Sequence, residues 1–221
     1  MDLGLGTLND VKQFVLPALY LENKDTQYDS VLGVIAKSVA GRFEKYCDRK
    51  FGRVVGDQCK FDANRSMYVL PRYPVEVLTA LELRAVLIDD WSDVLNTVIQ
   101  MDETAGIIKF GGWMSDSLVQ MRATWTGGYW YETQEPLQPD GVTPNPDYPS
   151  TMPEGATPLP DDLKGAWLNQ IHHEFQLKDQ LLPEGVANGA QKSRLNWRLD
   201  QAVLLPEVQN VIEQYRRYQI T

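Results

Sequence analysis

The sequence predicts a mixed α and β fold, with helices toward both ends of the chain and a β-rich middle. Before Phe51, apolar residues recur every three or four positions, which is typical of amphipathic helices. After it the pattern changes to short β-rich runs between turn signals, and helical spacing returns near Pro160. With 221 residues and 43% hydrophobic content, the chain is long enough to bury a substantial core.

Two helices are predicted in the first part of the chain. The first covers about residues 8–16, because Thr7 is a suitable N-cap, Asp10 follows three positions later as in a capping box, and Pro17 opposes continuation. The second covers about residues 28–47. Its apolar positions fall on one face, at Val31, Leu32, Ile35, Val39, Phe43 and Tyr46.

The β-rich region covers about residues 51–130 and predicts a small antiparallel sheet. The five residues from Met101 to Ala105 suit a hairpin loop between two of its strands. The predicted strands are Gln58 to Phe61, Ser66 to Leu70, Val75 to Leu83, Val94 to Gln100, Gly106 to Phe110 and Leu118 to Trp125.

An acidic, proline-rich loop is predicted at about residues 131–160. Residues 136–160 hold 8 of the chain's 13 prolines, so a packed element is not expected there. From Ala123 to Leu163 there is no lysine or arginine. The seven acidic residues of this span are Glu132, Glu135, Asp140, Asp147, Glu154, Asp161 and Asp162.

Two helices are predicted after this loop. The first covers about residues 161–180, with carboxylates in its first turn, where the helix dipole favours them. Its apolar stripe consists of Leu163, Trp167, Ile171 and Phe175. An extended segment at about 183–205 follows, and Pro206 then opens a last helix to about residue 218. The residues that share a face of this helix are Val208, Val211, Ile212 and Tyr215.

Charge and composition exclude several classes of function. The formal net charge of −9 has the wrong sign for a protein that binds nucleic acid through its phosphates. No apolar run approaches the length of about 20 residues that spans a bilayer, and the N-terminal residues lack a signal-peptide pattern. Cys47 and Cys59 match no disulfide framework or zinc spacing. We therefore expect a soluble chain with reduced thiols in the cytosol.

The sequence predicts neither an enzyme nor a metal or cofactor site. The only histidines, His172 and His173, are adjacent, so on a helix their rings point about a hundred degrees apart and do not form an i, i+4 metal pair. Neither the serines nor the cysteines carry a nucleophile motif, and no P-loop or Rossmann turn is present. We expect no catalytic residues, no metal and no cofactor.

Trp125, Tyr129 and Trp130 form the densest aromatic cluster, around Gly127 and Gly128. Three interpretations remain open at this stage. The cluster is the end of a strand packed on the core, a contact patch for another protein, or a stacking platform for a sugar in a carbohydrate-binding module.

The order of elements resembles the head-to-tail adaptor proteins (connector or head-completion proteins) of tailed bacteriophages. The segments that carry this resemblance, over most of residues 7–178, are Thr7-Leu8-Asn9-Asp10-Val11-Lys12, Phe43-Glu44-Lys45-Tyr46-Cys47-Asp48-Arg49-Lys50-Phe51, Tyr68-Val69-Leu70-Pro71-Arg72-Tyr73-Pro74-Val75, Asp102 to Phe110, Arg122-Ala123-Thr124-Trp125-Thr126-Gly127-Gly128-Tyr129, Leu159-Pro160-Asp161-Asp162-Leu163-Lys164 and Tyr215-Arg216-Arg217-Tyr218. Typical members have a short loop where this chain has its acidic, proline-rich segment, and residues 183–205 also resemble an addition.

The resemblance implies one adaptor domain over residues 1–221, mainly α: a helical bundle with a small antiparallel β-rich subdomain between the second and third helices. It implies a structural virion protein that forms a dodecameric ring under the portal protein, extends the DNA channel and provides the attachment site for a stopper or tail-completion protein. DNA would pass without specific binding, with no membrane involved. The location would be the head-tail junction of the virion, after assembly in the host cytoplasm. Another neck or tail-completion protein, such as a stopper, is the structural alternative.

The resemblance also directs attention to two partner-facing segments. We expect a portal or protomer interface at the C-terminal residues Trp197, Leu204, Tyr215, Arg216, Arg217 and Tyr218. We expect a lumen-facing or tail-facing acidic loop at Glu132, Glu135, Asp140, Asp147 and Glu154. Twelve chains of charge −9 give a ring of about −108, which would repel phosphate and let DNA slide.

Overall fold

The computed structural model of the chain describes residues 3–16, 26, 28–62, 65–85, 90–110, 119–131, 151–181 and 203–217. These residues divide into two compact units. A helical unit comprises the described residues up to Cys47 and those from Leu159 to Arg216. A β unit comprises the described residues of 48–131 and 151–158, together with Arg217.

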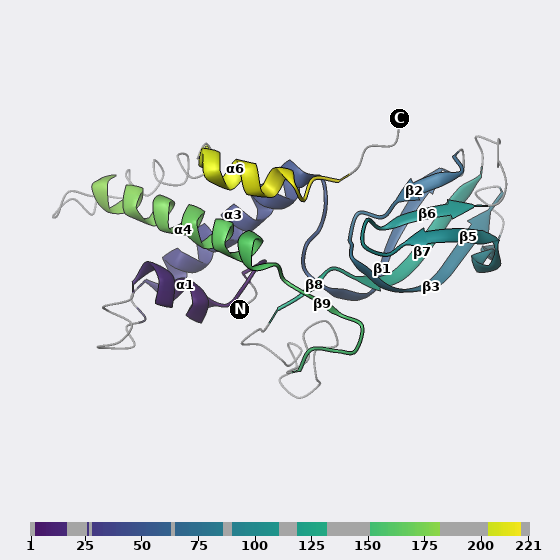
Figure 1. Ribbon diagram of the computed structural model, residues 1–221, viewed down its shortest axis with the longest axis horizontal. Helices are drawn as coiled ribbons and strands as arrows, with labels where there is room; N and C mark the ends of the chain where they lie inside the picture. Colours follow the sequence, from purple (N-terminus) through teal and green to yellow (C-terminus); the bar gives the residue numbers. More distant parts are fainter. Residues whose placement is uncertain are drawn as a thin grey trace. The chain divides into compact units, whose positions relative to one another are not determined.

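The expectation of a mainly α helical bundle is wrong. The described residues contain four α-helices and nine strands, so the fold is α+β (Figure 1). Six of the nine strands were predicted from their β-rich runs, but the share of the fold that these strands form was underestimated. These strands form two sheets that share one hydrophobic core. The β-rich region is therefore a compact unit with its own core rather than a small insertion.

The first helix of the helical unit, α1 (Leu8–Val15), begins at the capping box predicted from the sequence. The Thr7 hydroxyl accepts a hydrogen bond from the Asp10 N–H at 3.1 Å, and the Asp10 carboxylate accepts one from the Thr7 N–H at 2.9 Å. Burial alone would raise the pKa of Asp10, but the hydrogen bonds from Thr7 and Lys164 outweigh it, and the pKa is lowered.

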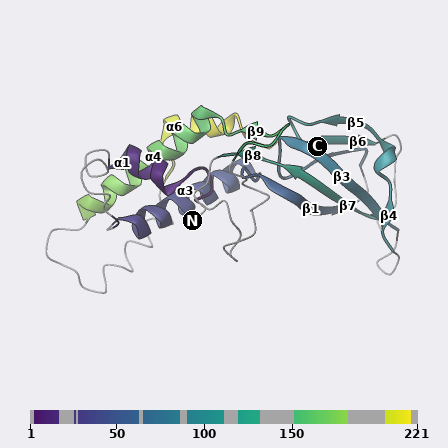
Figure 2. The ribbon, with the colours of Figure 1, turned by 90° about the horizontal axis from the view of Figure 1, so that it is seen from below.

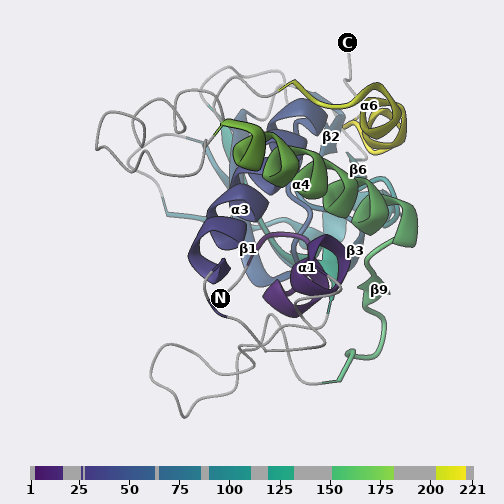
Figure 3. The same ribbon diagram turned by 90° about the vertical axis from the view of Figure 1, so that its left-hand side faces the viewer.

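The long helices α3 (Asp29–Cys47) and α4 (Asp161–Leu181) pack together, and α4 also contacts α1 and the last helix, α6 (Pro206–Glu213) (Figure 3). The apolar stripe predicted for α4 is buried: Leu163, Trp167 and Ile171 are all 0% exposed. The Trp167 indole donates a hydrogen bond to the Ala36 carbonyl of α3 at 3.1 Å. The α3–α4 packing is therefore the centre of the helical unit.

The larger sheet of the β unit has the strand order β1-β7-β3-β4. The strand β7 (Gln120–Gly127) lies between β1 (Val54–Asp62) and β3 (Val75–Arg84), and β4 (Ser92–Asp93) pairs with the other edge of β3. All of these pairings are antiparallel. Bulges interrupt the register between β1 and β7 and between β3 and β7.

The smaller sheet has the order β2-β6-β5, from β2 (Met67–Val69), β6 (Ile107–Phe110) and β5 (Val98–Asp102), with the 3₁₀ turn η1 (Leu95–Thr97) before β5. The predicted hairpin is present, since β5 pairs antiparallel with β6. The strands of the two sheets can be followed in Figure 2. Side chains from both sheets share one core, including Tyr68, Leu81, Ile108, Met121 and Trp125. The β unit is thus a two-sheet structure.

A third, two-stranded pairing joins β8 (Tyr129–Trp130) to β9 (Thr157–Pro158) in parallel. Just before β8, the backbone at Gly128 passes close to the backbone of Gly52. The φ of Gly128 is +99°, and a Cβ atom at this position would lie only 2.5 Å from the Gly52 carbonyl oxygen. Only glycine adopts this conformation readily and permits this approach. Gly128 thereby lets Tyr129 form a hydrogen bond with Phe51 at 2.7 Å.

Candidate assembly interface

The C-terminal helix α6, which we expected to face the portal, is built into the helical unit through its apolar side. Val208 and Ile212 are 1% and 0% exposed, and Leu204 just before the helix is 9% exposed. The helix contacts α4 and α3. Because its own chain covers this face, the face is not free to enter a groove on a partner while the helix stays docked.

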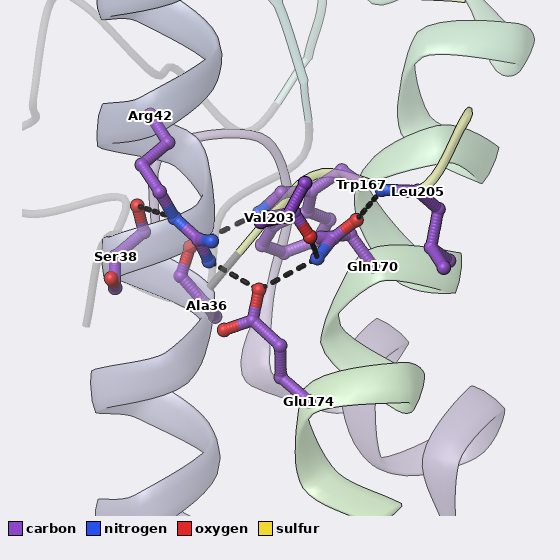
Figure 4. A network of polar contacts seen from close by, with 8 residues as sticks. All are labelled: Ala36, Ser38, Arg42, Trp167, Gln170, Glu174, Val203 and Leu205. Atoms are coloured by element: carbon purple, nitrogen blue, oxygen red, sulfur yellow. Dashed lines mark hydrogen bonds and ion pairs between the residues drawn. The ribbon is translucent and has the colours of Figure 1, made fainter. Parts of the chain in front are cut away.

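A polar network fixes the segment that leads into α6 (Figure 4). The Gln170 side chain of α4 accepts a hydrogen bond from the Leu205 N–H at 2.9 Å and donates one to the Val203 carbonyl at 3.4 Å. It also donates to the Glu174 carboxylate at 2.8 Å. Gln170 is 0% exposed, so its amide satisfies backbone groups that would otherwise be buried without partners.

The same carboxylate joins α4 to α3. Glu174, 2% exposed, forms an ion pair with the Arg42 guanidinium, which also donates to the Ser38 carbonyl (Figure 4). A buried carboxylate requires such a partner, because removal from water destabilises the unpaired charge. The Arg42–Glu174 pair therefore ties the α3–α4 packing to the Gln170 contacts with the C-terminal segment.

Three further contacts hold α6 to its neighbours. The Cys47 thiol donates to the Ile212 carbonyl at 3.2 Å, and the Tyr46 hydroxyl donates to the Glu213 carboxylate at 2.8 Å. The second bond raises the pKa of Tyr46 and lowers that of Glu213. Just beyond the helix, the Tyr215 hydroxyl donates to the Asp162 carboxylate at 2.6 Å.

The residues expected at the portal interface therefore have different positions. Leu204 is buried, Tyr215 is half-buried, and Arg216 is exposed. Arg217 belongs to the β unit, where it donates to the Val69 carbonyl and lies 3.6 Å from the Asp48 carboxylate. Trp197 and Tyr218, also expected there, lie outside the described residues.

The aromatic cluster is mostly core. Trp125 is 0% exposed, and its indole donates to the Arg72 carbonyl at 2.9 Å, while Tyr129 is 7% exposed. Trp130 is half-buried. The strand-end interpretation fits this arrangement. A sugar platform or contact patch made of all three rings does not, because stacking requires exposed ring faces.

Tyr129 instead helps to enclose a buried arginine. The Arg49 side chain, 5% exposed, places its guanidinium carbon 3.4 Å from the centroid of the Tyr73 ring, and at 5.1 and 5.4 Å from those of Phe51 and Tyr129. It also donates to the Tyr73 carbonyl. Such cation–π contacts stabilise a desolvated cation, so this group is a structural element of the β unit.

Most of the expected acidic loop lies outside the described residues, including Glu132, Glu135, Asp140 and Asp147. Glu154 is described and exposed. The exposed Asp161 and Asp162 continue the acidic character into the first turn of α4. The position of the loop in an assembly therefore stays a prediction.

Within the described part of the chain, no group of three or more histidine, cysteine, aspartate or glutamate side chains is placed to hold a metal ion. His172 shares a hydrogen bond of 2.8 Å with Gln176 and makes an edge-to-face contact with Phe14. Burial raises the pKa of the Cys59 thiol to about 12, which opposes thiolate chemistry. Of the helices that are described, none combines the length and apolarity of a membrane span.

The sequence reasoning missed the Arg42–Glu174 and Gln170 contacts. Glu174 is not among the site residues that the sequence predicts. The available signal was the i, i+4 spacing of Gln170 and Glu174, which places the two polar side chains on one face of α4, beside its apolar stripe. Sequence spacing alone does not identify the partner, since Arg42 lies 132 positions away.

No protein-family model matches the chain, and no curated protein matches it. Solved structures that share its fold include the following two. One is a chain in the neck of an empty gene transfer agent (GTA) particle computed with C6 symmetry, with a TM-score of 0.52, and the other belongs to the virion of a native GTA particle, with a TM-score of 0.58. Each alignment has 15% identity and covers 97% of this chain and 90% of the other.

Proposed function

We propose that this chain is a structural protein of a phage-type neck, and specifically a head-to-tail adaptor. The observation that carries the proposal is the shared fold with a chain of a GTA neck over 97% of this chain and 90% of that one. Because fold alone does not define function, the order of sequence segments resembling the adaptor family is an independent support.

In this role the chain forms a ring under the portal, the dodecamer that the family resemblance implies, and the ring extends the DNA channel. The formal charge of −9 per chain supports a passage for DNA without specific binding, because like charges repel the phosphates. The acidic loop with Glu132, Glu135, Asp140, Asp147 and Glu154 lines the lumen or meets the next tail component. A structure of the ring with that segment on the outer rim would contradict its placement in the lumen.

The chain acts as a structural component and not as an enzyme, and it takes no cofactor. Its partners are the portal protein, further copies of itself and a stopper or tail-completion protein, and it resides at the head-tail junction of the virion after assembly in the host cytoplasm. Portal docking uses the exposed side of the C-terminal region, represented among the described residues by Arg216, because the apolar side of α6 is covered by α3 and α4.

Native mass spectrometry tests the proposal. The purified chain is measured alone over a concentration series, and then with the portal protein encoded in the same genome. We expect a closed ring with the symmetry of the portal, alone or bound to it. A chain that stays monomeric and ignores the portal at every concentration refutes the adaptor role and favours a stopper or another tail component.

The variant Arg216→Glu tests the docking surface. The Arg216 guanidinium is about half exposed and forms an ion pair with Glu213 at 3.2 Å, so its substitution does not touch the buried side chains Val208 and Ile212. The matched control is Lys109→Glu, which makes the same change of charge in the β unit. Weaker portal binding by Arg216→Glu alone supports docking through the C-terminal region, and equal binding by both variants contradicts it.

A further inference from the structure

One outward face of α3 combines lysines with a glycine that the chain itself does not require. Lys37, Gly41 and Lys45 are exposed and lie on one stripe together with Val34, which is 59% exposed. A Cβ at Gly41 would meet no atom within 4 Å. Among the residues that the structure describes, neither lysine has an ion-pair partner.

The outward face of α4 has the complementary character. Asp161 is exposed and, among the described residues, unpaired. One turn later Gly165 also has open space where a Cβ would be, and Asn169 is exposed. His172 follows on the same stripe with the Phe14 ring of α1 against it, at a centroid distance of 5.9 Å.

The two stripes match when the helices are placed antiparallel. Lys45 and Gly41 are four residues apart, as are Asp161 and Gly165, so each pair spans about 6 Å along its helix. With Gly41 opposite Gly165, Lys45 comes opposite Asp161. The same register places Lys37 opposite Asn169 and the exposed Val34 opposite the ring pair of Phe14 and His172.

We propose that the α3 stripe (Val34, Lys37, Gly41 and Lys45) binds the α4 stripe (Asp161, Gly165, Asn169 and His172) of a second copy of this chain. The inference rests on the proposed ring and names the contact between neighbouring copies. Two different complementary surfaces make a head-to-tail contact, which closes into a ring when the rotation between copies permits. The occupant is a second copy because this chain supplies both the cationic and the anionic surface.

The glycines are an independent support for close packing. A glycine in the interior of an exposed helix destabilises it relative to alanine, because the backbone has more freedom in the unfolded state. At Gly41 and Gly165 nothing within the described chain occupies the space that a methyl group would take. Close approach of a helix backbone from another copy would explain why both positions are glycine, because a side chain would prevent that approach.

The charge test uses the full-length chain and measures assembly by mass photometry over a concentration series, with and without the portal protein. Lys45→Glu should raise the concentration of half-assembly by about tenfold or more. Adding Asp161→Lys to that variant should restore assembly, since the pair is then reversed. Lys60→Glu is the matched control, because it changes an exposed lysine of the β unit by the same charge.

The glycine test separates assembly from folding. Gly41→Ala and Gly165→Ala should raise the midpoint of thermal unfolding of the monomer, because alanine favours the helix, and yet weaken assembly. A merely structural role of these positions predicts the first effect without the second.

The outcomes separate this contact from the proposed function. Loss with Lys45→Glu, rescue by the charge swap and weaker assembly of the stabilised glycine variants support the contact. Rings that form normally from these variants overturn the contact and leave the adaptor role intact. A wild-type chain that forms no ring with or without the portal overturns both.

Discussion

Removal of the last helix should destabilise the helical unit strongly, because α6 is part of its core. Truncation after Leu205 removes Val208 and Ile212, which are 1% and 0% exposed. A C-terminal helix that served only as a portal contact would leave a chain without residues 206–221 folded. The burial of these two side chains leads to the opposite expectation.

The magnitude follows from the two buried side chains. Full burial of a valine or isoleucine contributes about 1.5 to 3 kcal/mol, so their loss together lowers the free energy of unfolding by about 3 to 6 kcal/mol. A domain of ordinary size has about 5 to 15 kcal/mol in total. The single substitution Ile212→Ala should cost about 2 to 5 kcal/mol by the same reasoning.

Urea unfolding followed by far-ultraviolet circular dichroism measures this change, because all the α-helices described belong to the helical unit. Alkylation of Cys47 is a second measurement. Its thiol is 0% exposed and bonded to the Ile212 carbonyl, so it reacts only when α6 detaches. Val203→Ala is the control, since Val203 is 77% exposed in the same segment. Unchanged unfolding and continued protection of Cys47 in the truncated chain would refute the reasoning.

Three further predictions concern single groups. Arg42→Met should lower the free energy of unfolding by about 3 kcal/mol in a urea titration, because it leaves the buried Glu174 carboxylate unpaired; a loss below that of an exposed substitution would contradict this. The lowered pKa of Asp10 means that its contribution to stability is complete above its ordinary value of 3.8 and is lost as the pH falls below it. Urea midpoints measured from neutral to acid pH should therefore fall less steeply for Asp10→Asn than for the wild type, and parallel curves would exclude the effect. The pKa of about 12 at Cys59 predicts that its thiol resists iodoacetamide at neutral pH until the β unit unfolds; rapid labelling of the native chain at Cys59, identified by peptide mass, would show the prediction to be wrong.

Local patterns in the sequence correctly predicted the local structure. The Thr7 and Asp10 capping box, the buried stripe containing Trp167 and the helix opened by Pro206 depend on residues within a few positions of one another. Their physical causes are hydrogen bonds at a helix end, side-chain periodicity and the fixed φ of proline. The short pairing of β8 with β9 was missed, because its partners are far apart in the sequence.

Trp125 illustrates what strand patterns leave open. An aromatic residue at the end of a strand is compatible with the core, with a protein interface and with a sugar platform, because all three favour large apolar rings. The tertiary structure decided between them: the Trp125 ring is buried in the core that the two sheets share, and the Arg72 carbonyl accepts its indole hydrogen bond. The size of the β unit likewise could not be predicted from single strands, because it depends on two sheets sharing one core.

By itself, the sequence determined the acidic charge, the position of the main helices and strands, and the order of segments that resembles the adaptor family. Only the tertiary structure decided which faces are covered: the apolar side of α6 lies on α3 and α4, while Lys45 of α3 and Asp161 of α4 stay exposed. The physical reason is that periodicity, which depends only on residues close together in the sequence, predicts whether one face of a helix or strand is apolar or polar. Whether that face meets another part of the same chain depends on contacts between residues that are distant in sequence, as between Arg42 and Glu174.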